Sequence, residues 1–298
     1  MTASVGHANH VAPASLVKRP STERLRESRP LLFYVALGWL GVIVLAGVFA
    51  QWLPVGPYGE AIGPPKQAPF GSGGFEAILG TDNIGRSLLS RCVYGARASL
   101  VIGTIAGVTG FAIGSTLGLL AGYFRGRVDV VITVLADAML AFPPLILLLG
   151  LSAVLTPSMQ TLLIGLTLLV IPSFTRLARA NTMAWSSREF VLAARNMGSG
   201  HLRIITREIL PNVIPPLATY MPIVIAALIV AEGSLSFLGL GIPPPTPSWG
   251  GMIAAGQDSI ESAPFVVLVP AAVIFVTVFS FNVVGDHLRK RFDASGHA

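Results

Sequence analysis

Asp137 is the acidic residue of this 298-residue sequence that lies deepest in an apolar environment, directly before the uncharged run 138–175. An acid inside a long apolar helix is a functional candidate by default, as a proton relay or an ion site. At 1.5 Å per residue, however, Asp137 lies only about 10 Å from the predicted helix boundary at Val130, where water or another helix is within reach. We find no second buried acid or base at comparable depth in the other apolar runs. A structural or gating role is therefore favoured over ion coupling.

Residues 186–210 form a second group of candidates, and their chemistry is that of a protein-docking surface. Ser186 and Glu189 have the spacing of a capping box, and Gly198 can end the helix in the left-handed conformation. A second short helix is expected from Ser199 to Ile209, before Pro211. The alternative is an amphipathic loop whose arginines extend to anionic lipid, which explains the charge but not the small residues. The expected docking residues are Glu189, Phe190, Ala193, Ala194, Asn196, Met197 and Gly198.

Motifs for catalysis and nucleotide binding do not occur in the sequence. The three lysines Lys18, Lys66 and Lys290 follow no glycine pattern of a P-loop, so the chain is not expected to bind ATP through one. There is no HExxH, GxSxG or CxxC, and the five histidines are scattered. A single cysteine, Cys92, excludes an internal disulfide and a cysteine metal cluster. No catalytic residue and no metal site are expected.

The composition requires that lipid, not water, surrounds most of this chain. Apolar residues make up 53% of the sequence and charged residues only 11%, against roughly 25% charged in ordinary soluble domains. A membrane helix needs about 20 predominantly apolar residues, and the uncharged run 138–175 is long enough for two. We expect an all-α integral membrane protein with six spans. They lie near 31–53, 98–121, 130–153, 159–180, 211–232 and 265–286.

The distribution of the net charge of +6 predicts the orientation. Sixteen of the 20 basic residues fall in the two termini and in the loops after spans two and four. The positive-inside rule therefore places both termini in the cytoplasm, in an inner-membrane protein that binds no nucleic acid. Residues 1–30 contain no apolar signal-peptide core and are predicted to be a cytoplasmic tail. The other parts are the first span 31–53, an outer loop 54–96, a core 97–286 and a cytoplasmic tail 287–298.

Two spans are the candidates for lining a path through the membrane. Pro143 and Pro144 should kink the third span, and Pro222, next to Met221, belongs to a group of prolines that should make the first half of the fifth span irregular. Irregular backbone at membrane depth is tolerated where it faces protein or water. With Asp137, these four residues are the expected path or gate. The fourth span has no clear stop and should project into the cytoplasm.

The second span carries six glycines at helical spacing, at positions 103, 107, 110, 114, 118 and 122. Small residues in this pattern allow helix backbones to approach closely. We therefore expect this span to pack tightly against another helix.

Two outer segments should form the mouth. In loop 54–96, Thr81 or Asp82 can cap a short amphipathic helix lying along the membrane surface. Residues 233–257 are rich in glycine and proline and are predicted to be a loop, or alternatively a re-entrant segment. Each is either a lid or a contact for an external protein. The expected contact residues are Trp249, Gly250 and Tyr58.

Several of these segments resemble a known family. AARNMG followed by ILP is similar to the EAA loop of type I ABC-importer permeases, with Leu192 at the position of the family's glutamate. Further segments, in order, resemble the C-type subunit of the dipeptide/oligopeptide permease branch over roughly residues 31–293. They are ILGTDNIGRSLLSRCVYGARASL, EFVLAARNMG, EGSLSFLGLGIPPPTPSWGGMI and FNVVGDHLRKRFD, and Ser87 stands where the branch commonly has Asp.

The resemblance implies the type I ABC importer permease fold and a non-catalytic subunit of an ATP-driven peptide importer in the bacterial inner membrane. It also implies four kinds of neighbour: a second homologous permease, two cytoplasmic ATP-binding subunits, an external substrate-binding protein and membrane lipid. ATP and Mg would then be bound by the partner subunits. In this mechanism, ATP-driven motion pushes the 189–198 helix and rotates the core spans.

Three other readings remain open. A proton-driven secondary transporter would use Asp137 as the carrier but leaves the cytoplasmic loop unexplained. The same ABC role could serve glutathione or nickel complexes instead of peptides. A membrane-embedded enzyme would need a paired catalytic set within the spans, and none is found.

Overall fold

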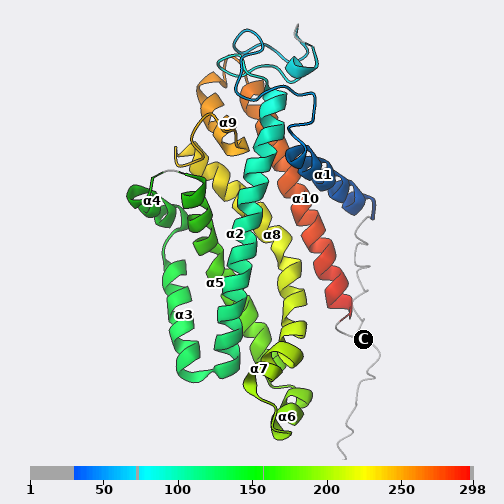
Figure 1. Cartoon of the computed structure of the whole chain (residues 1–298), viewed down its shortest axis with the longest axis vertical. Coiled ribbons are helices and arrows are strands. Elements are labelled where there is room, and N and C mark those ends of the chain that lie inside the picture. Colours follow the sequence, from blue (N-terminus) through cyan, green and yellow to red (C-terminus); the bar gives the residue numbers. More distant parts are fainter. Residues whose placement is uncertain (1–29, 72–73, 157, 296–298) are drawn as a thin grey trace, which may run out of the picture.

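The computed structural model describes residues 30–71, 74–156 and 158–295. Within these ranges the protein is all-helical, and its only β-type pairings are two isolated bridges, Ala61 with Arg86 and Thr81 with Ser87. The helices form an elongated bundle with the 54–87 loop and α9 at one end and the α6–α7 region at the other (Figure 1). The helices are α1 Pro30–Val48, α2 Leu88–Phe124, α3 Gly126–Ala141, α4 Pro144–Val154, α5 Met159–Ser186, α6 Glu189–Asn196, α7 His201–Arg203, α8 Leu210–Phe237, α9 Trp249–Gly256 and α10 Phe265–Ser295.

Five of the described helical stretches are long and apolar enough to cross a membrane, and the bent pair α3–α4 gives a sixth if it is one span. The all-α architecture with up to six membrane helices agrees with the prediction from the sequence. α10 continues as helix to Ser295, well past the predicted end of the last span at 286. The predicted tail 1–30 lies outside the described residues except for Pro30.

The glycine face of α2 packs against α5 and α8, as predicted. A Cβ added at Gly118 would lie 2.4 Å from the carbonyl oxygen of Thr175, and one at Gly114 would lie 2.6 Å from that of Ile171. Toward the outer end, Gly103 approaches Ile229 of α8 instead. Because backbones in such contact leave no room for side chains, α2 forms the centre of the bundle.

The prediction that the third span is a single kinked helix is wrong. α3 and α4 meet at 89° and are separate helices. Pro144 is the first residue of α4, and Phe142 and Pro143 are extended. A proline provides no N–H for the preceding helix and forces the residue before it out of the helical region, so two successive prolines produce a break and not a gentle kink.

The predicted irregular first half of span five is also wrong. α8 is a continuous helix through Pro215, Pro216 and Pro222. It is preceded by a π-helical turn, Ile204–Ile209, so the expected separate helix ending before Pro211 instead runs into α8. α5 reaches Ser186 and so extends beyond the apolar segment, as expected from its lack of a stop.

The outer loop differs from its prediction as well. Residues 81–87 form no amphipathic helix along the membrane surface, because the Asp82 side chain accepts hydrogen bonds from the backbone N–H groups of Ile84 and Arg86 and so closes a turn. The N-cap of the following helix is Ser87, whose hydroxyl accepts from the Ser90 N–H. From Leu88 the chain enters α2 directly. Within 233–257 the structure contains the end of α8, a loop and the two-turn helix α9.

Candidate docking end, cavity and outer mouth

α6 projects from the end of the bundle opposite the outer loop, as Figure 1 shows. Val191 and Ala194 are buried and attach it to the bundle, where they pack with Tyr123 of α2 and Ile209. Ala194 therefore anchors the helix and is not part of the docking surface that the sequence predicts. The other predicted docking residues, Glu189, Phe190, Ala193, Asn196, Met197 and Gly198, are exposed.

The exposed surface of this end is more apolar than the sequence analysis recognised. Met197 is 78% exposed and Leu202, on α7, is 76% exposed, and Leu192 of α6 is also exposed. Large apolar side chains left in water on a projecting element indicate a contact with another protein. Leu192 and Leu202 were missed because their signal, exposure, depends on which face of α6 and α7 the fold leaves open.

The ends of α6 are formed differently from the predicted capping box. Ser186 belongs to the end of α5, where its hydroxyl donates to the Met183 carbonyl, and the N-cap residue of α6 is Arg188 without a side-chain cap. At the other end, Gly198 adopts φ +80°, the left-handed conformation predicted for it. The Ser199 N–H donates to the Ala194 carbonyl at 3.0 Å, and the Gly198 N–H donates to that of Arg195.

A cavity of about 1010 Å³ lies between α5, α8 and α10, on the side of the bundle that leads to α6. Each of the three helices contributes a charged or an amide side chain to the lining of this cavity. Pro215 and Pro216 of α8 also line it, and their missing N–H groups leave the carbonyls of Pro211 and Asn212 without helical donors. The polar and aromatic side chains that line it are Ser173, Arg176, Asn181, Trp185, Asn212, Thr219, Tyr220, Arg289 and Phe292.

Trp185 belongs to both the cavity and the docking end. Its indole ring lines the cavity, and its centroid lies 6.2 Å from that of Phe190 on α6. The guanidinium of Arg188 lies 5.3 Å from the same indole ring. Trp185 therefore lies between the cavity and α6.

The predicted path residues do not line this cavity. Asp137 forms an ion pair with Arg176 at 2.6 Å, and the two side chains are 52% and 56% exposed, so Asp137 is not an isolated buried acid. Pro143 and Pro144 lie at the exposed bend between α3 and α4. Met221 packs against the Gly107 face of α2, and neighbouring Pro222 is absent from the cavity lining. Of this group only Asp137 reaches the cavity, through Arg176.

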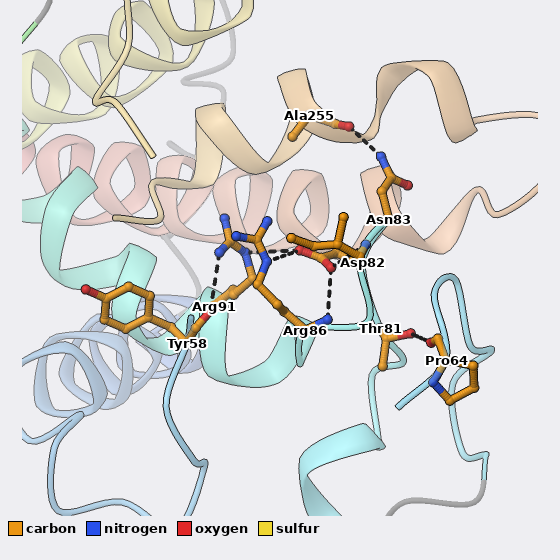
Figure 2. A network of polar contacts seen from close by, with 9 residues as sticks. Tyr58, Pro64, Thr81, Asp82, Asn83, Arg86, Arg91 and Ala255 are labelled. Carbon is orange, nitrogen blue, oxygen red and sulfur yellow. Dashed lines mark hydrogen bonds and ion pairs between the residues drawn. The ribbon is translucent and has the colours of Figure 1, made fainter. Parts of the chain in front are cut away.

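The outer loop is organised around one carboxylate, as Figure 2 shows. Asp82 Oδ2 accepts from Arg86 Nε at 2.7 Å and lies 3.6 Å from Nε of the buried Arg91. Arg91 Nη1 also donates to the Tyr58 carbonyl, at 3.3 Å. The next residue, Asn83, donates to the Ala255 carbonyl of α9 at 2.7 Å. Asp82 thus joins the loop to the start of α2, and Asn83 joins it to α9.

The prediction that Trp249 and Gly250 contact an external protein is wrong, because both residues are buried. Trp249 is 0% exposed, and its indole N–H donates to the Cys92 carbonyl at 2.9 Å. Gly250 is buried against Gly233, so neither residue reaches the surface. Tyr58 is partly exposed and packs on Tyr94, with 4.9 Å between the ring centroids. The exposed large apolar side chains of the outer loop are instead Phe70, Phe75 and Ile84.

Glu232 is a buried polar residue that the sequence analysis missed. It is 0% exposed, and its carboxylate accepts from Ser99 Oγ at 3.1 Å and from Ser236 Oγ at 2.8 Å. The Ser99 hydroxyl oxygen in turn accepts a hydrogen bond from the backbone N–H of Trp249 at 3.3 Å. Glu232 directly follows the uncharged run that ends at Ala231. In the sequence it therefore looks like a residue at the end of a span, and its burial could not be predicted. Ser99 of α2 and Ser236 of α8 surround this carboxylate only after folding.

In the described residue ranges, no group of three or more His, Cys, Asp or Glu side chains lies close enough together to hold a metal ion. The polar clusters of this chain are ion pairs and hydrogen-bonded caps between helices. They are suited to holding helices in place and to binding other molecules.

Comparison with known proteins agrees with this architecture. A di/tripeptide transport system permease protein of Pseudomonas aeruginosa is 39% identical over 259 residues, which cover 85% of this chain and 84% of that protein. A glutathione transport system permease protein of Escherichia coli is 36% identical over 85% of this chain and 82% of its own length. The inward-facing MetNI methionine ABC transporter has the same fold, with a TM-score of 0.58 over 68% of this chain and 97% of that one at 18% identity.

The family model of the binding-protein-dependent transport system inner membrane component matches residues 114–294. This range contains the glycine face of α2 from Gly114 onward, the docking helix α6, the cavity helices α5, α8 and α10, and the buried Glu232. The chain therefore belongs to the family of inner membrane components of binding-protein-dependent transport systems.

Proposed function

We propose that this chain is a permease subunit of an ATP-driven importer of dipeptides and longer peptides, and that it forms half of the translocation path. The observation that carries the proposal is the contact between Trp185, which lines the cavity, and Phe190, which lies on the docking helix. A subunit that converts a partner's motion into a change of access needs such a direct mechanical connection. The permeases named for di/tripeptides and for glutathione among its relatives support a peptide-like substrate.

The α6–α7 end is proposed to dock on a cytoplasmic ATP-binding subunit. Its exposed apolar residues, chiefly Met197 and Leu202, suit a hydrophobic cleft better than a salt bridge. Leu192, at the position of the family's glutamate, makes the surface more apolar still. In this proposal two ATP-binding subunits bind ATP and Mg, and both termini of this chain face the cytoplasm with them.

The cavity between α5, α8 and α10 is proposed as this chain's part of the path on the cytoplasmic side. Its volume is in the range of sites for small organic ligands. The side chains of Arg176, Asn181 and Asn212 provide polar partners for a passing peptide. A second, homologous permease would close the open side of the cavity, since half a path cannot seal a membrane.

The outer loop, with Phe70 and Phe75 exposed, is proposed to meet an external substrate-binding protein. A photo-crosslinker placed at Phe70 should react with the added binding protein, while one at the buried Trp249 should not. Crosslinking at neither position would leave the outer loop as a lid only.

The test of the whole assignment is reconstitution. Purification of the chain should bring with it two ATPase subunits and a second six-span permease, and uptake of labelled dipeptides by vesicles should require ATP and the binding protein. Labelled oligopeptides, glutathione and a nickel complex, each with and without the cognate binding protein, separate the substrate alternatives. Uptake of the bound substrate at the same rate with and without ATP would refute the assignment.

The proton-driven alternative makes a different prediction for Asp137. Because its carboxylate is paired with Arg176 and both side chains are half exposed, the pair contributes little, about 0–1 kcal/mol. An Asp137→Asn variant should keep most of its ATP-dependent uptake. Uptake driven by a proton gradient alone, and lost in this variant, would favour the secondary transporter.

A further inference from the structure

We propose that a pocket between residues 82–91, α9 and the start of α10 binds a small organic carboxylate. The pocket has a volume of about 180 Å³ and lies at the outer-loop end of the bundle, apart from the cavity between α5, α8 and α10. Sites for drug-sized ligands measure about 300–1,000 Å³. This smaller pocket therefore suits a carboxylate with a short carbon chain.

The polar side chains of the pocket carry more positive charge than they neutralise. Arg86 and Arg91 both line it, and Asp82 is the one acidic residue of its lining. Figure 2 shows both guanidinium groups beside this carboxylate, with Arg86 Nε 2.7 Å and Arg91 Nε 3.6 Å from the same oxygen, Asp82 Oδ2. Among the described residues neither arginine forms an ion pair with another carboxylate. One of the two positive charges is therefore left without a counter-charge.

This excess charge lies where water reaches it poorly. The Arg91 side chain is 8% exposed and the Arg86 side chain 15%. Arg91 Nη1 donates to the Tyr58 carbonyl, whereas within the described ranges Arg91 Nη2 and both Nη atoms of Arg86 make no hydrogen bond. A charge held out of water is costly unless it is paired. A second anion would receive charge-assisted hydrogen bonds from these N–H groups.

Asp82 cannot serve both arginines equally. Its Oδ1 accepts from the backbone N–H groups of Ile84 and Arg86 at 3.0 and 2.9 Å, and its Oδ2 accepts from Arg86 Nε. These three hydrogen bonds fix the carboxylate in its turn. The 3.6 Å from Arg91 Nε to Oδ2 is too long for a fourth. The geometry thus leaves Arg91 available to an anion from outside.

The remainder of the pocket is lined mainly by apolar side chains. Leu88, Met252 and Val266 line it and belong to one packed cluster of buried residues. A short hydrocarbon chain gains free energy when it leaves water for such a surface. Chloride or phosphate would lose hydration there without this gain. Guanidinium groups beside a buried apolar wall therefore favour a carboxylate that carries a few carbon atoms.

The pocket is accessible, and its two sides are joined before any ligand binds. Ile84 and Ala255 line it and are exposed. Asn83 Nδ2 donates to the Ala255 carbonyl at 2.7 Å, and Asn83 Oδ1 accepts from Ser259 Oγ at 2.6 Å. Preorganisation of this kind lowers the entropic cost of binding. A bound carboxylate would add a second tie between the outer loop and α9, whether or not the chain transports peptides.

Fluorine NMR of trifluorobutanoate tests the proposal on the full-length chain in detergent. The line of this probe should broaden when the protein is added, and butanoate should reverse the broadening. Trifluorobutanamide, which has the same chain but no charge, should broaden no more than it does with protein-free micelles. Equal broadening of the two probes would refute a carboxylate site. Reversal by chloride at the same concentration as butanoate would identify a simple anion site and also refute the proposal.

Variants on two sides of the pocket locate the binding. Arg86→Gln should weaken binding about tenfold, because it removes hydrogen bonds between charged groups. Arg86→Lys should retain part of the affinity, since the ammonium keeps the charge but not the planar fork. Ala255→Leu leaves every charge in place and should abolish binding by filling the pocket. The matched control is Arg97→Gln, which removes an exposed arginine of α2 that does not line the pocket.

Limited proteolysis of the 54–87 loop shows which variants keep its structure. In the unaltered chain butanoate should slow cleavage and butanamide should not, and equal rates with both would contradict the proposed tie to α9. Unchanged binding in Ala255→Leu, or in an Arg86→Gln protein that resists cleavage, would refute the pocket. If Arg86→Gln is readily cut, Ala255→Leu alone decides. Loss of binding in Arg97→Gln equal to that in Arg86→Gln would place the effect in surface charge and also refute the site.

Discussion

The ring of Trp185 lies with its centroid 6.2 Å from that of Phe190, across the junction of α5 and α6. Trp185 lines the 1010 Å³ cavity, and Phe190 is exposed on the docking helix. The two rings connect the surface proposed to receive the ATPase with the cavity proposed to pass substrate.

Trp185→Ala should uncouple the two activities. ATP hydrolysis by the assembled transporter should persist while peptide uptake falls about tenfold, since an aromatic contact contributes roughly 0.5–1.5 kcal/mol. Trp185→Phe should retain most of the uptake. The measurement is uptake per ATP hydrolysed in vesicles, with Phe275→Ala, an exposed ring on α10, as control. A parallel fall in hydrolysis and uptake would show that Trp185 serves assembly instead.

Gly118→Ala should destabilise the bundle. The added Cβ would lie 2.4 Å from the Thr175 carbonyl oxygen and 2.5 Å from the Ala178 Cβ, so the backbones of α2 and α5 must separate. Overpacking of this kind costs about 1–3 kcal/mol. Thermal unfolding in detergent measures it, and Gly150→Ala, where an added Cβ meets nothing within 4 Å, is the control. Equal melting temperatures for the two variants would contradict the proposed role of the glycine face.

Glu232→Ala should loosen α9 and expose the single cysteine of the chain. Cys92 is 4% exposed beneath Trp249 and Met252, and Glu232 holds that region through Ser99. Removal of a buried hydrogen-bonded acceptor costs roughly 1–3 kcal/mol, so maleimide should label Cys92 at least about tenfold faster. Glu232→Gln keeps an acceptor and should label at an intermediate rate.

Exposed Glu261 provides the control for this labelling experiment. Glu261→Ala should leave the rate at Cys92 unchanged. If Glu232→Ala also leaves it unchanged, the carboxylate does not position α9.

Asp82→Ala should release the outer loop. Arg86 and the buried Arg91 would lose their shared carboxylate, and two backbone N–H groups would lose an acceptor. Breaking a buried pair by removing one partner costs about 3–5 kcal/mol. Limited proteolysis should then cut within 54–87 while the membrane helices stay intact. Glu60→Ala, at an exposed site in the same loop, should remain resistant. Equal resistance of both variants would show that the loop is held by other contacts.

The sequence by itself determined the parts of this protein that depend on local composition. Long uncharged runs need lipid around them, so an all-helical membrane protein followed from the residues alone; the described residues contain five long apolar helices, and a sixth if α3 and α4 form one span. The glycine spacing predicted the close approach of α2 to another helix, and Gly198 predicted its own left-handed cap, because both effects depend on a missing side chain at a known position.

Only the tertiary structure decided where polar groups meet. Asp137 looked isolated until α5 brought Arg176 to it, and Glu232 looked like the end of an apolar run until Ser99 and Ser236 closed over it. Trp249 looked like a contact for an external protein until the fold buried it against α2. These contacts depend on which faces of different helices touch, and contacts between separate helices leave no periodic signal in the sequence.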